Sequence, residues 1–249
     1  MERHTQSRAS LLWPSIFTGI AVAILVSLGI WQLDRLGWKE KLIAQIDSRA
    51  DAPPTPLPPQ KEWSNLEPND YDYSHVQAQG IFENDKEALV FRASGGPAAY
   101  EPGYLVLTPL RLASGGTVIV NRGFVPMNRK AQDQRRAGLI EGETTVTGLM
   151  RSPEARNIFT PADVPATGSY FTRDPFLIAQ QFHLTDAAPF TLDADDLPVT
   201  GGWPKGGTTI RKLPNNHLSY ALTWFSLAFV TFTAFAAFIW QRRKSEETA

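Results

Sequence analysis

Two long apolar runs dominate the pattern of hydrophobic and polar positions along this chain. Residues 11–33 contain 16 hydrophobic residues in 23 positions, residues 218–240 contain 18 in 23, and neither run contains a charge. At 1.5 Å per residue, a helix of this length covers a hydrocarbon core of roughly 30 Å. We therefore expect transmembrane helices over 11–33 and 218–240.

Aromatic residues near the ends of the runs support this interpretation. Trp13 and Trp31 lie near the ends of the first run, and Trp240 ends the second, a placement typical of membrane–water boundaries. A cleaved signal peptide is the alternative for the first run. The run is longer than the usual 7–15 apolar residues and no A-x-A-like site follows it, so we expect an uncleaved anchor. The preceding ten residues are too few for a mitochondrial transit peptide, which favours a bacterial inner membrane.

Basic residues suggest an orientation for the two spans. Arg3 and Arg8 precede the first span, and Arg242, Arg243 and Lys244 follow the second. The positive-inside rule then places the tails at 1–10 and 241–249 in the cytoplasm and the intervening chain outside. Basic residues also flank the inner ends of both spans, which weakens the preference: Arg35, Lys39, Lys41, Lys205, Arg211 and Lys212.

A linker is expected at 34–60. Apolar residues at Trp38, Leu42 and Ile46 recur at helical spacing, so the first helix should continue as an amphipathic helix to Arg49. A proline-rich stretch at 52–59 stops it and predicts an extended polyproline-like segment. A recognition motif for a partner domain is the alternative to a plain linker.

Short runs of β-forming residues fill most of the chain between the spans. Ser114, Gly115 and Gly116 separate two of them and signal a hairpin. Residues 175–182 form the one helix expected among them. We predict a membrane α+β protein, in which two transmembrane helices flank an antiparallel β-rich extracytoplasmic domain over 61–217. The expected strands are 75–82, 89–92, 104–112, 117–125, 144–150, 170–173, 190–193 and 208–213.

Composition narrows the possible functions. The 249-residue chain has a net charge of −1, so it lacks the basic excess typical of nucleic-acid binding. Cysteine is absent, which excludes disulfides, thiolate metal sites and covalent haem attachment. Methionine occurs only three times, which argues against a thioether copper site.

No catalytic constellation is visible. The four histidines are His4, His75, His183 and His217, and none is spaced with another for a metal. We expect His75 and His183 to be ordinary surface or half-buried residues, and we expect no enzyme activity. Asp193, Asp195 and Asp196 could bind calcium, although a solvated turn is the preferred interpretation.

His217 has a different position, because it opens the second apolar run. Asn215 or Asn216 can cap the helix that begins there. Tyr220, Trp224 and Ala228 share a helical face with His217. A neutral imidazole beside flat aromatic rings suits a porphyrin iron. The alternative is an interfacial histidine whose ring is simply hydrogen-bonded.

The first run offers two further candidates. Gly19, Ala23 and Ser27 form a stripe of small residues that lets helices approach closely. The partner is either the second span, which we favour, or another membrane protein. Arg35 lies one turn beyond Trp31 and could pair with a porphyrin propionate or a lipid phosphate.

Three motifs resemble those of SURF1/Shy1-type proteins. GIWQLDRLGWK at 29–39 resembles the motif that ends their first span. GYLVLTPL at 103–110, followed by VIVNRGFVP at 118–126, resembles their central motif. NNHLSYALTWF at 215–225 resembles the motif that opens their second span. Phe124 and Ser219 stand where Trp and Gln are common in the family.

The resemblance implies a function. The family is implicated in assembly of haem–copper terminal oxidases, and bacterial members resemble chaperones that bind haem a beside haem a synthase and oxidase subunit I. The resemblance makes His217 the proposed haem ligand, and Tyr220 and Trp224 would line the porphyrin. A membrane scaffold that stabilises subunit I without carrying haem is the alternative.

Overall fold

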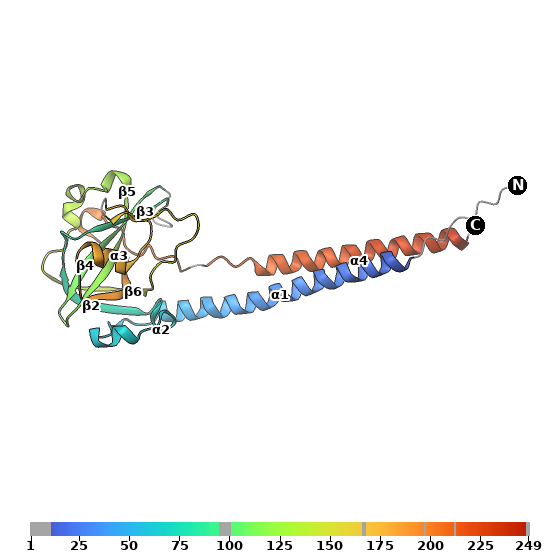
Figure 1. The fold of residues 1–249 in the computed structure, drawn as a ribbon, viewed down its shortest axis with the longest axis horizontal. Coiled ribbons are helices and arrows are strands. Elements are labelled where there is room, and N and C mark those ends of the chain that lie inside the picture. Colours follow the sequence, from blue (N-terminus) through green and yellow to red (C-terminus); the bar gives the residue numbers. More distant parts are fainter. Residues whose placement is uncertain (1–10, 95–100, 166–167, 197, 212, 248–249) are drawn as a thin grey trace. The chain divides into compact units, whose positions relative to one another are not determined.

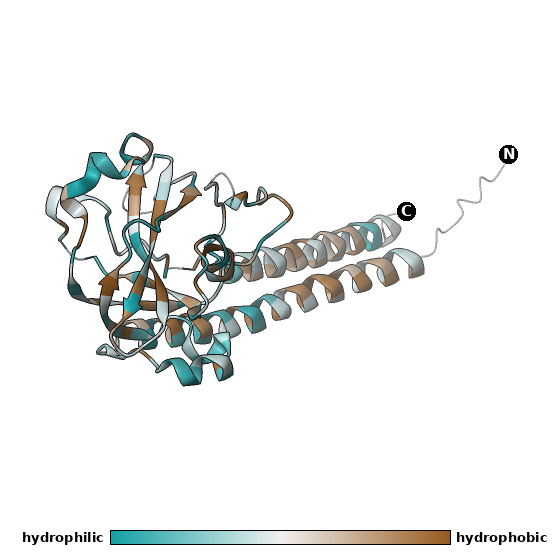
Figure 2. Cartoon of the chain, turned by 60° about the vertical axis from the view of Figure 1, so that its left-hand side comes forward, coloured by the Kyte–Doolittle hydropathy of each residue, from teal (hydrophilic) through white to brown (hydrophobic). Residues whose placement is uncertain are grey.

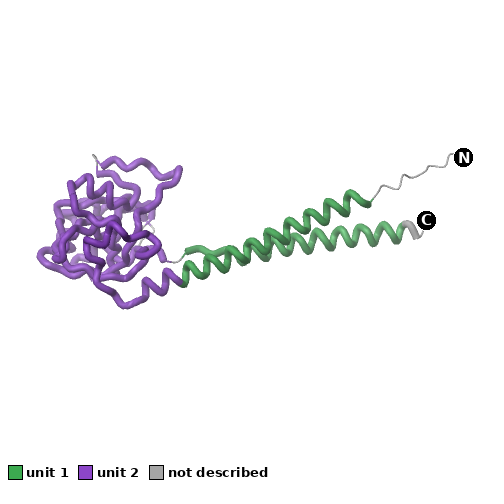
Figure 3. The backbone as a smooth tube through the Cα atoms, turned by 60° about the horizontal axis from the view of Figure 1, so that its bottom comes forward, with its two compact units in different colours: residues 1–44, 212–249 green, residues 45–211 purple. Residues whose placement is uncertain are grey.

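The structure is a computed structural model that describes residues 11–94, 101–165, 168–196, 198–211 and 213–247. The chain divides into two compact units, shown in different colours in Figure 3. One unit comprises residues 1–44 and 212–249, and the other comprises Gln45–Arg211. The tail at 1–10, expected in the cytoplasm, lies outside the described residues.

The first unit is built from two long helices that run side by side (Figure 1). Helix α1 extends over Leu12–Ala50, and α4 extends over His217–Glu247. Both are long and apolar enough to cross a membrane. Figure 2 shows the apolar residues along both helices in brown. The first span continues as a helix beyond residue 33, as expected, because α1 runs without a break to Ala50.

The second unit is rich in β-structure, and most of its expected elements are present. The expected hairpin is confirmed, since β4 (Gly103–Leu112) and β5 (Thr117–Pro126) pair antiparallel across Ser114–Gly116. The helix expected at 175–182 is α3 (Pro175–Gln181). The strands are β1 (Thr55–Pro56), β2 (His75–Phe82), β3 (Ala88–Arg92), β4 (Gly103–Leu112), β5 (Thr117–Pro126), β6 (Glu143–Arg151) and β7 (Ala187–Ala194). The helices are α2 (Pro68–Tyr71) and α3 (Pro175–Gln181), with 3-10 turns at Gln60–Asn65, Met127–Arg129, Gln132–Gly138 and Thr200–Gly202.

The strands form a closed barrel. Their order is β1-β2-β6-β7-β5-β4-β3, and a further pairing of β2 with β4 closes the ring of β2, β6, β7, β5 and β4. The expectation of a purely antiparallel domain is wrong, because β5 pairs with β7 in parallel and β1 pairs with β2 in parallel. The parallel β5–β7 pair is possible because a long crossover, containing β6 and α3, connects these strands.

The core has two layers that share β5. Val118 and Val120 point into the barrel, whereas Ile119 points to a second cluster with Val90, Leu107 and other residues near α3. Both faces of β5 are therefore buried, which explains why Val118, Ile119 and Val120 are three consecutive apolar positions and do not alternate with polar ones. β2 instead alternates between buried and more exposed positions, because only one of its faces lines the core.

Two expected strands are not formed in the described chain. The segment 170–173 makes one isolated bridge, between Tyr170 and Val90. The amides of Phe171 and Thr172 donate to the carboxylate of Asp163 instead of to a neighbouring strand. The segment 208–213, whose residue 212 lies outside the described residues, is not a strand where it is described. Its Thr209 hydroxyl donates to Asp193.

Candidate functional site

The site begins at the first residue of α4. His217 opens the helix, and its backbone N–H lies 3.4 Å from Oδ1 of Asn215. The Asn216 carbonyl accepts from the N–H of Tyr220. The helix start is therefore held by its flanking residues, and of the two expected caps, Asn215 and Asn216, it is Asn215 whose side chain accepts this hydrogen bond.

His217 contacts the other helix through a polar pair. Its Nδ1 lies 2.7 Å from Oε1 of Gln32 on α1. Gln32 is only 9% exposed, and it is the one strongly polar residue of the uncharged run at 11–33. Because a carbonyl oxygen can only accept, the Nδ1–H of His217 is the donor. In a neutral ring with this proton on Nδ1, the lone pair lies on Nε2, the nitrogen that could bind a metal.

The predicted aromatic face around His217 is divided in the structure. Tyr220 is 56% exposed and Trp224 is half-buried, while Ala228 is buried. Ala221 is also buried. The buried face of α4 therefore follows Ala221 and Ala228, and Tyr220 is left on the open surface. Both aromatic residues remain within the first two turns of α4, near His217 in the chain.

Among the described residues, the observed contact of Arg35 is with Trp38 and not with His217. Its guanidinium carbon lies 4.9 Å from the ring centre of Trp38, which is a cation–π contact one turn further along α1. Arg35 is exposed, so its charge faces the surface of the helix. It lies one turn beyond Gln32 on α1.

The two helices approach each other at Gly29, not at the predicted stripe. A Cβ added at Gly29 would lie 2.5 Å from the ring of Phe225, so only glycine leaves room for that ring. Gly19, Ala23 and Ser27 are exposed, and no atom lies within 4 Å of the position of a Cβ at Gly19. The preference for packing of this stripe against the second span is therefore wrong. The alternative, a different membrane partner, stays open.

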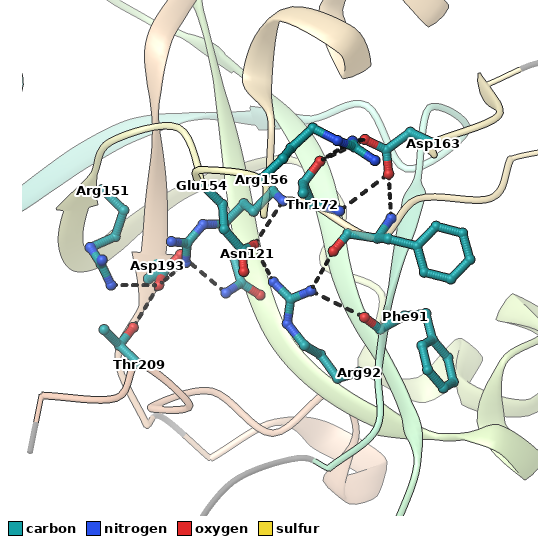
Figure 4. A network of polar contacts seen from close by, with 12 residues as sticks. Phe91, Arg92, Asn121, Arg151, Glu154, Arg156, Asp163, Thr172, Asp193 and Thr209 are labelled. Atoms are coloured by element: carbon teal, nitrogen blue, oxygen red, sulfur yellow. Dashed lines mark hydrogen bonds and ion pairs between the residues drawn. The ribbon is translucent and has the colours of Figure 1, made fainter. Parts of the chain in front are cut away.

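The acidic cluster is not a solvated turn as expected. Asp193 is 2% exposed and accepts from Arg173 at 2.6 Å, Thr209 at 2.6 Å and Asn121 at 3.1 Å. Figure 4 shows this network around Asp193. The carboxylate joins β5, β7 and the segment after β7, which is a structural role. Asp196 alone is exposed.

His75 and Asp195 form a second polar pair in the barrel unit. The Nε2 of His75 lies 2.9 Å from Oδ2 of Asp195, and its Nδ1 lies 2.7 Å from the carbonyl of Ala52. Both residues line a cavity of about 330 Å³, together with Asp193 and Arg211. Among the described residues, no group of three or more His, Asp or Glu side chains is arranged to hold a metal. His183 is exposed.

Gln32 is the site residue that the sequence analysis misses. It lies 185 positions from His217, so no local pattern connects the two. The available signal is a single amide in an otherwise apolar span, since a polar group in such a helix needs a partner. That signal points to a contact without naming the partner.

Comparisons with known proteins agree with the family resemblance that the three sequence motifs indicate. The SURF1 family model matches residues 19–229. Surfeit locus protein 1 of Rattus norvegicus is 34% identical over 234 residues, which cover 89% of this chain and 72% of the rat protein. The human protein of the same name is 35% identical over 218 residues, covering 82% of this chain and 70% of that protein. A SURF1-like protein of Monosiga brevicollis is 34% identical over 231 residues, covering 89% and 84%. The predicted resemblance is confirmed, and the chain belongs to the SURF1 family.

Proposed function

We propose that this protein is a membrane-bound assembly factor for haem–copper terminal oxidases, and that it binds haem a through His217. Membership of the SURF1 family supports the role in oxidase assembly. The observation that carries haem binding is the 2.7 Å contact between His217 Nδ1 and Gln32 Oε1. An imidazole with one nitrogen hydrogen-bonded and the other open has the donor arrangement typical of metal-ligating histidines.

The residues around His217 fit a porphyrin by their chemistry. In the described chain, no hydrogen bond is made by Nε2 of His217. Tyr220 and Trp224 provide flat apolar surface nearby in α4, and the exposed charge of Arg35 suits a propionate. Bound haem a would supply an iron centre for the oxidase, and this chain would act as its carrier and not as an enzyme.

A carrier must also release what it holds. A single half-buried histidine at the start of α4 supports this, because one protein ligand can be exchanged more readily than an enclosed pocket can be opened. We propose haem a synthase as the source of haem a and oxidase subunit I as its recipient. We place the two helices in a bacterial inner membrane, with both tails cytoplasmic and the barrel unit on the outer side.

Co-expression with haem a synthase tests haem binding. The visible spectrum of the purified full chain should show bound haem a for the wild type and a large loss for His217→Ala. His183→Ala is the matched control, since His183 is an exposed histidine of the barrel unit, and it should retain haem a. Equal haem a content in wild type and His217→Ala would exclude His217 as the ligand.

The second candidate function is a scaffold that holds subunit I without haem. The exposed stripe of Gly19, Ala23 and Ser27 favours it, because the stripe is not used in packing α1 against α4. A scaffold should retain subunit I during purification in His217→Ala and lose it when Gly19 and Ala23 are both changed to Leu. Loss of subunit I in the His217 variant alone would contradict this function.

A further inference from the structure

We propose that Gln32 is a positioning residue that holds His217 with Nε2 open to the iron. This inference rests on the proposed haem function, because it assigns a role to Gln32 in that same site. It is carried by one interhelical hydrogen bond, by the burial of Gln32 and by the chemistry of the amide.

Burial shows that the contact is not incidental. Gln32 is 9% exposed in an uncharged apolar segment, where an amide without a hydrogen-bond partner is strongly destabilising. Its Oε1 lies 2.7 Å from Nδ1 of His217. The hydrogen bond therefore satisfies a polar group that the helix pair buries.

The direction of the hydrogen bond fixes the tautomer of His217. Since the amide oxygen accepts, the proton of the neutral ring lies on Nδ1 and the lone pair lies on Nε2. The same bond fixes the rotation of the ring about its side chain. The metal-binding nitrogen is thus selected and oriented before any ligand arrives.

Because the acceptor, the Gln32 amide, is neutral, it also affects how tightly His217 would hold iron. A carboxylate partner would make the imidazole a stronger electron donor and a tighter iron ligand. An amide holds the same geometry while raising the basicity of the ring less. Gln32 therefore favours a defined ligand that can still release its cargo.

The tautomer can be measured without any haem. In full-length protein carrying ¹⁵N-labelled histidine in detergent, the His217 resonances are assigned by their loss in His217→Gln. We expect the wild-type ring to be protonated on Nδ1, and Gln32→Met, which keeps the volume but replaces the amide oxygen with a thioether that accepts only weakly, to change that state. Gln45→Met makes the same change at an exposed position of α1 and should have no effect. A wild-type ring protonated on Nε2, or an unchanged ring in Gln32→Met, would overturn the inference.

Titration with haemin then tests the consequence for ligation. We expect Gln32→Met to weaken haemin binding by about 10- to 100-fold, the range typical of lost partners of metal-ligating histidines. Gln32→Glu retains an acceptor and should retain binding, with a lower reduction potential of the bound iron than the wild type. Equal affinities for wild type and Gln32→Met would overturn the positioning role.

Failure of the proposed haem binding at His217 would give a different result from failure of the positioning role of Gln32. In that case wild type and His217→Ala would bind haemin equally, whatever residue stands at position 32. The same result would remove the ligand role of Nε2. The ¹⁵N measurement would still show whether Gln32 selects the tautomer, so the two failures are distinguishable.

Discussion

His75 Nε2 lies 2.9 Å from Asp195 Oδ2, and this pair connects the first residue of β2 to the residue that follows β7. The second ring nitrogen faces another acceptor, the Ala52 carbonyl. Two acceptors can both be satisfied only when both nitrogens carry protons, so the geometry favours the imidazolium. Burial alone would lower the pKa of His75, but the hydrogen bonds to Asp195 and Ala52 and the Asp195 charge outweigh it and raise the pKa, despite the opposing charge of Arg211.

The first prediction is a pH dependence of the barrel unit. The folded pKa of His75 lies above the ordinary value of 6.5, so the extra stability is fully present below about pH 6.5 and is lost as pH rises through the folded pKa. For a partly exposed pair the expected loss is about 1 kcal/mol or less. Thermal unfolding of the full chain in detergent, followed by circular dichroism, should show a decline above pH 6.5 that His75→Gln reduces.

Two further variants make this test specific. Asp195→Asn removes the charge of the partner and should reduce the decline as His75→Gln does. His183→Gln changes an exposed histidine and should leave the decline intact. A decline of equal size in wild type and His75→Gln would assign the pH dependence to other groups.

The second prediction concerns the buried carboxylate of Asp193. Arg173 donates to it at 2.6 Å, and both side chains are buried. In Asp193→Asn the guanidinium loses its counter-charge inside the protein, so unfolding should become easier by about 3–5 kcal/mol. The matched control is Asp196→Asn, an exposed aspartate three positions away that should change stability by less than about 0.5 kcal/mol. Denaturant unfolding measures both, and similar values for the two variants would contradict the role of Asp193.

The elements with a strong hydrophobic period are the ones that sequence predicts well. β2 occupies the expected residues, since its alternation reflects one buried face. The strand expected at 170–173 fails because the side chain of Asp163 takes the amide hydrogen bonds that a neighbouring strand would need. The residue pattern of 170–173 gives no indication that a side chain elsewhere in the chain binds the amides of this segment.

The features that the sequence does not predict depend on pairings between residues far apart in the chain. Closure of the barrel depends on β2 pairing with β4 and on the parallel pairing of β5 with β7, and neither is encoded in the period of one strand. The same holds at the candidate site. His217 is visible from its place at the start of an apolar helix, whereas Gln32 becomes a partner only through the packing of α1 and α4.

The third prediction concerns Gly123 in β5, where φ is +115°. A Cβ there would lie 1.8 Å from the carbonyl oxygen of Lys205, which also accepts from the amide of Phe124 at 2.8 Å. Gly123→Ala must therefore displace a backbone and break this bridge, and we expect it to destabilise the barrel unit by roughly 3 kcal/mol or more. Gly142 also has a positive φ, of 77°, but open space around it, so Gly142→Ala should cost only about 1–2 kcal/mol. Equal losses of stability would show that strain, and not the contact with Lys205, decides the outcome.

The fourth prediction tests how α1 and α4 approach each other. The Cβ of a residue larger than glycine at position 29 would meet the ring of Phe225 at 2.5 Å. Overpacking of this kind costs roughly 1–3 kcal/mol, so Gly29→Leu should separate the helices. Because the chain has no cysteine, spin labels can be attached at cysteines introduced at the exposed positions Ile30 and Leu222. The distance between the two labels should become longer and more broadly distributed in Gly29→Leu.

Two comparisons decide whether Phe225 is the cause. Gly29→Leu combined with Phe225→Ala removes the obstructing ring and should restore much of the wild-type distance. Gly19→Leu adds the same side chain at a glycine with no atom within 4 Å, so the distance should not change. A longer distance in Gly19→Leu would mean that the small-residue stripe packs against α4 after all. An unchanged distance in Gly29→Leu would contradict close packing at Gly29, and with it the helix contact that brings Gln32 to His217.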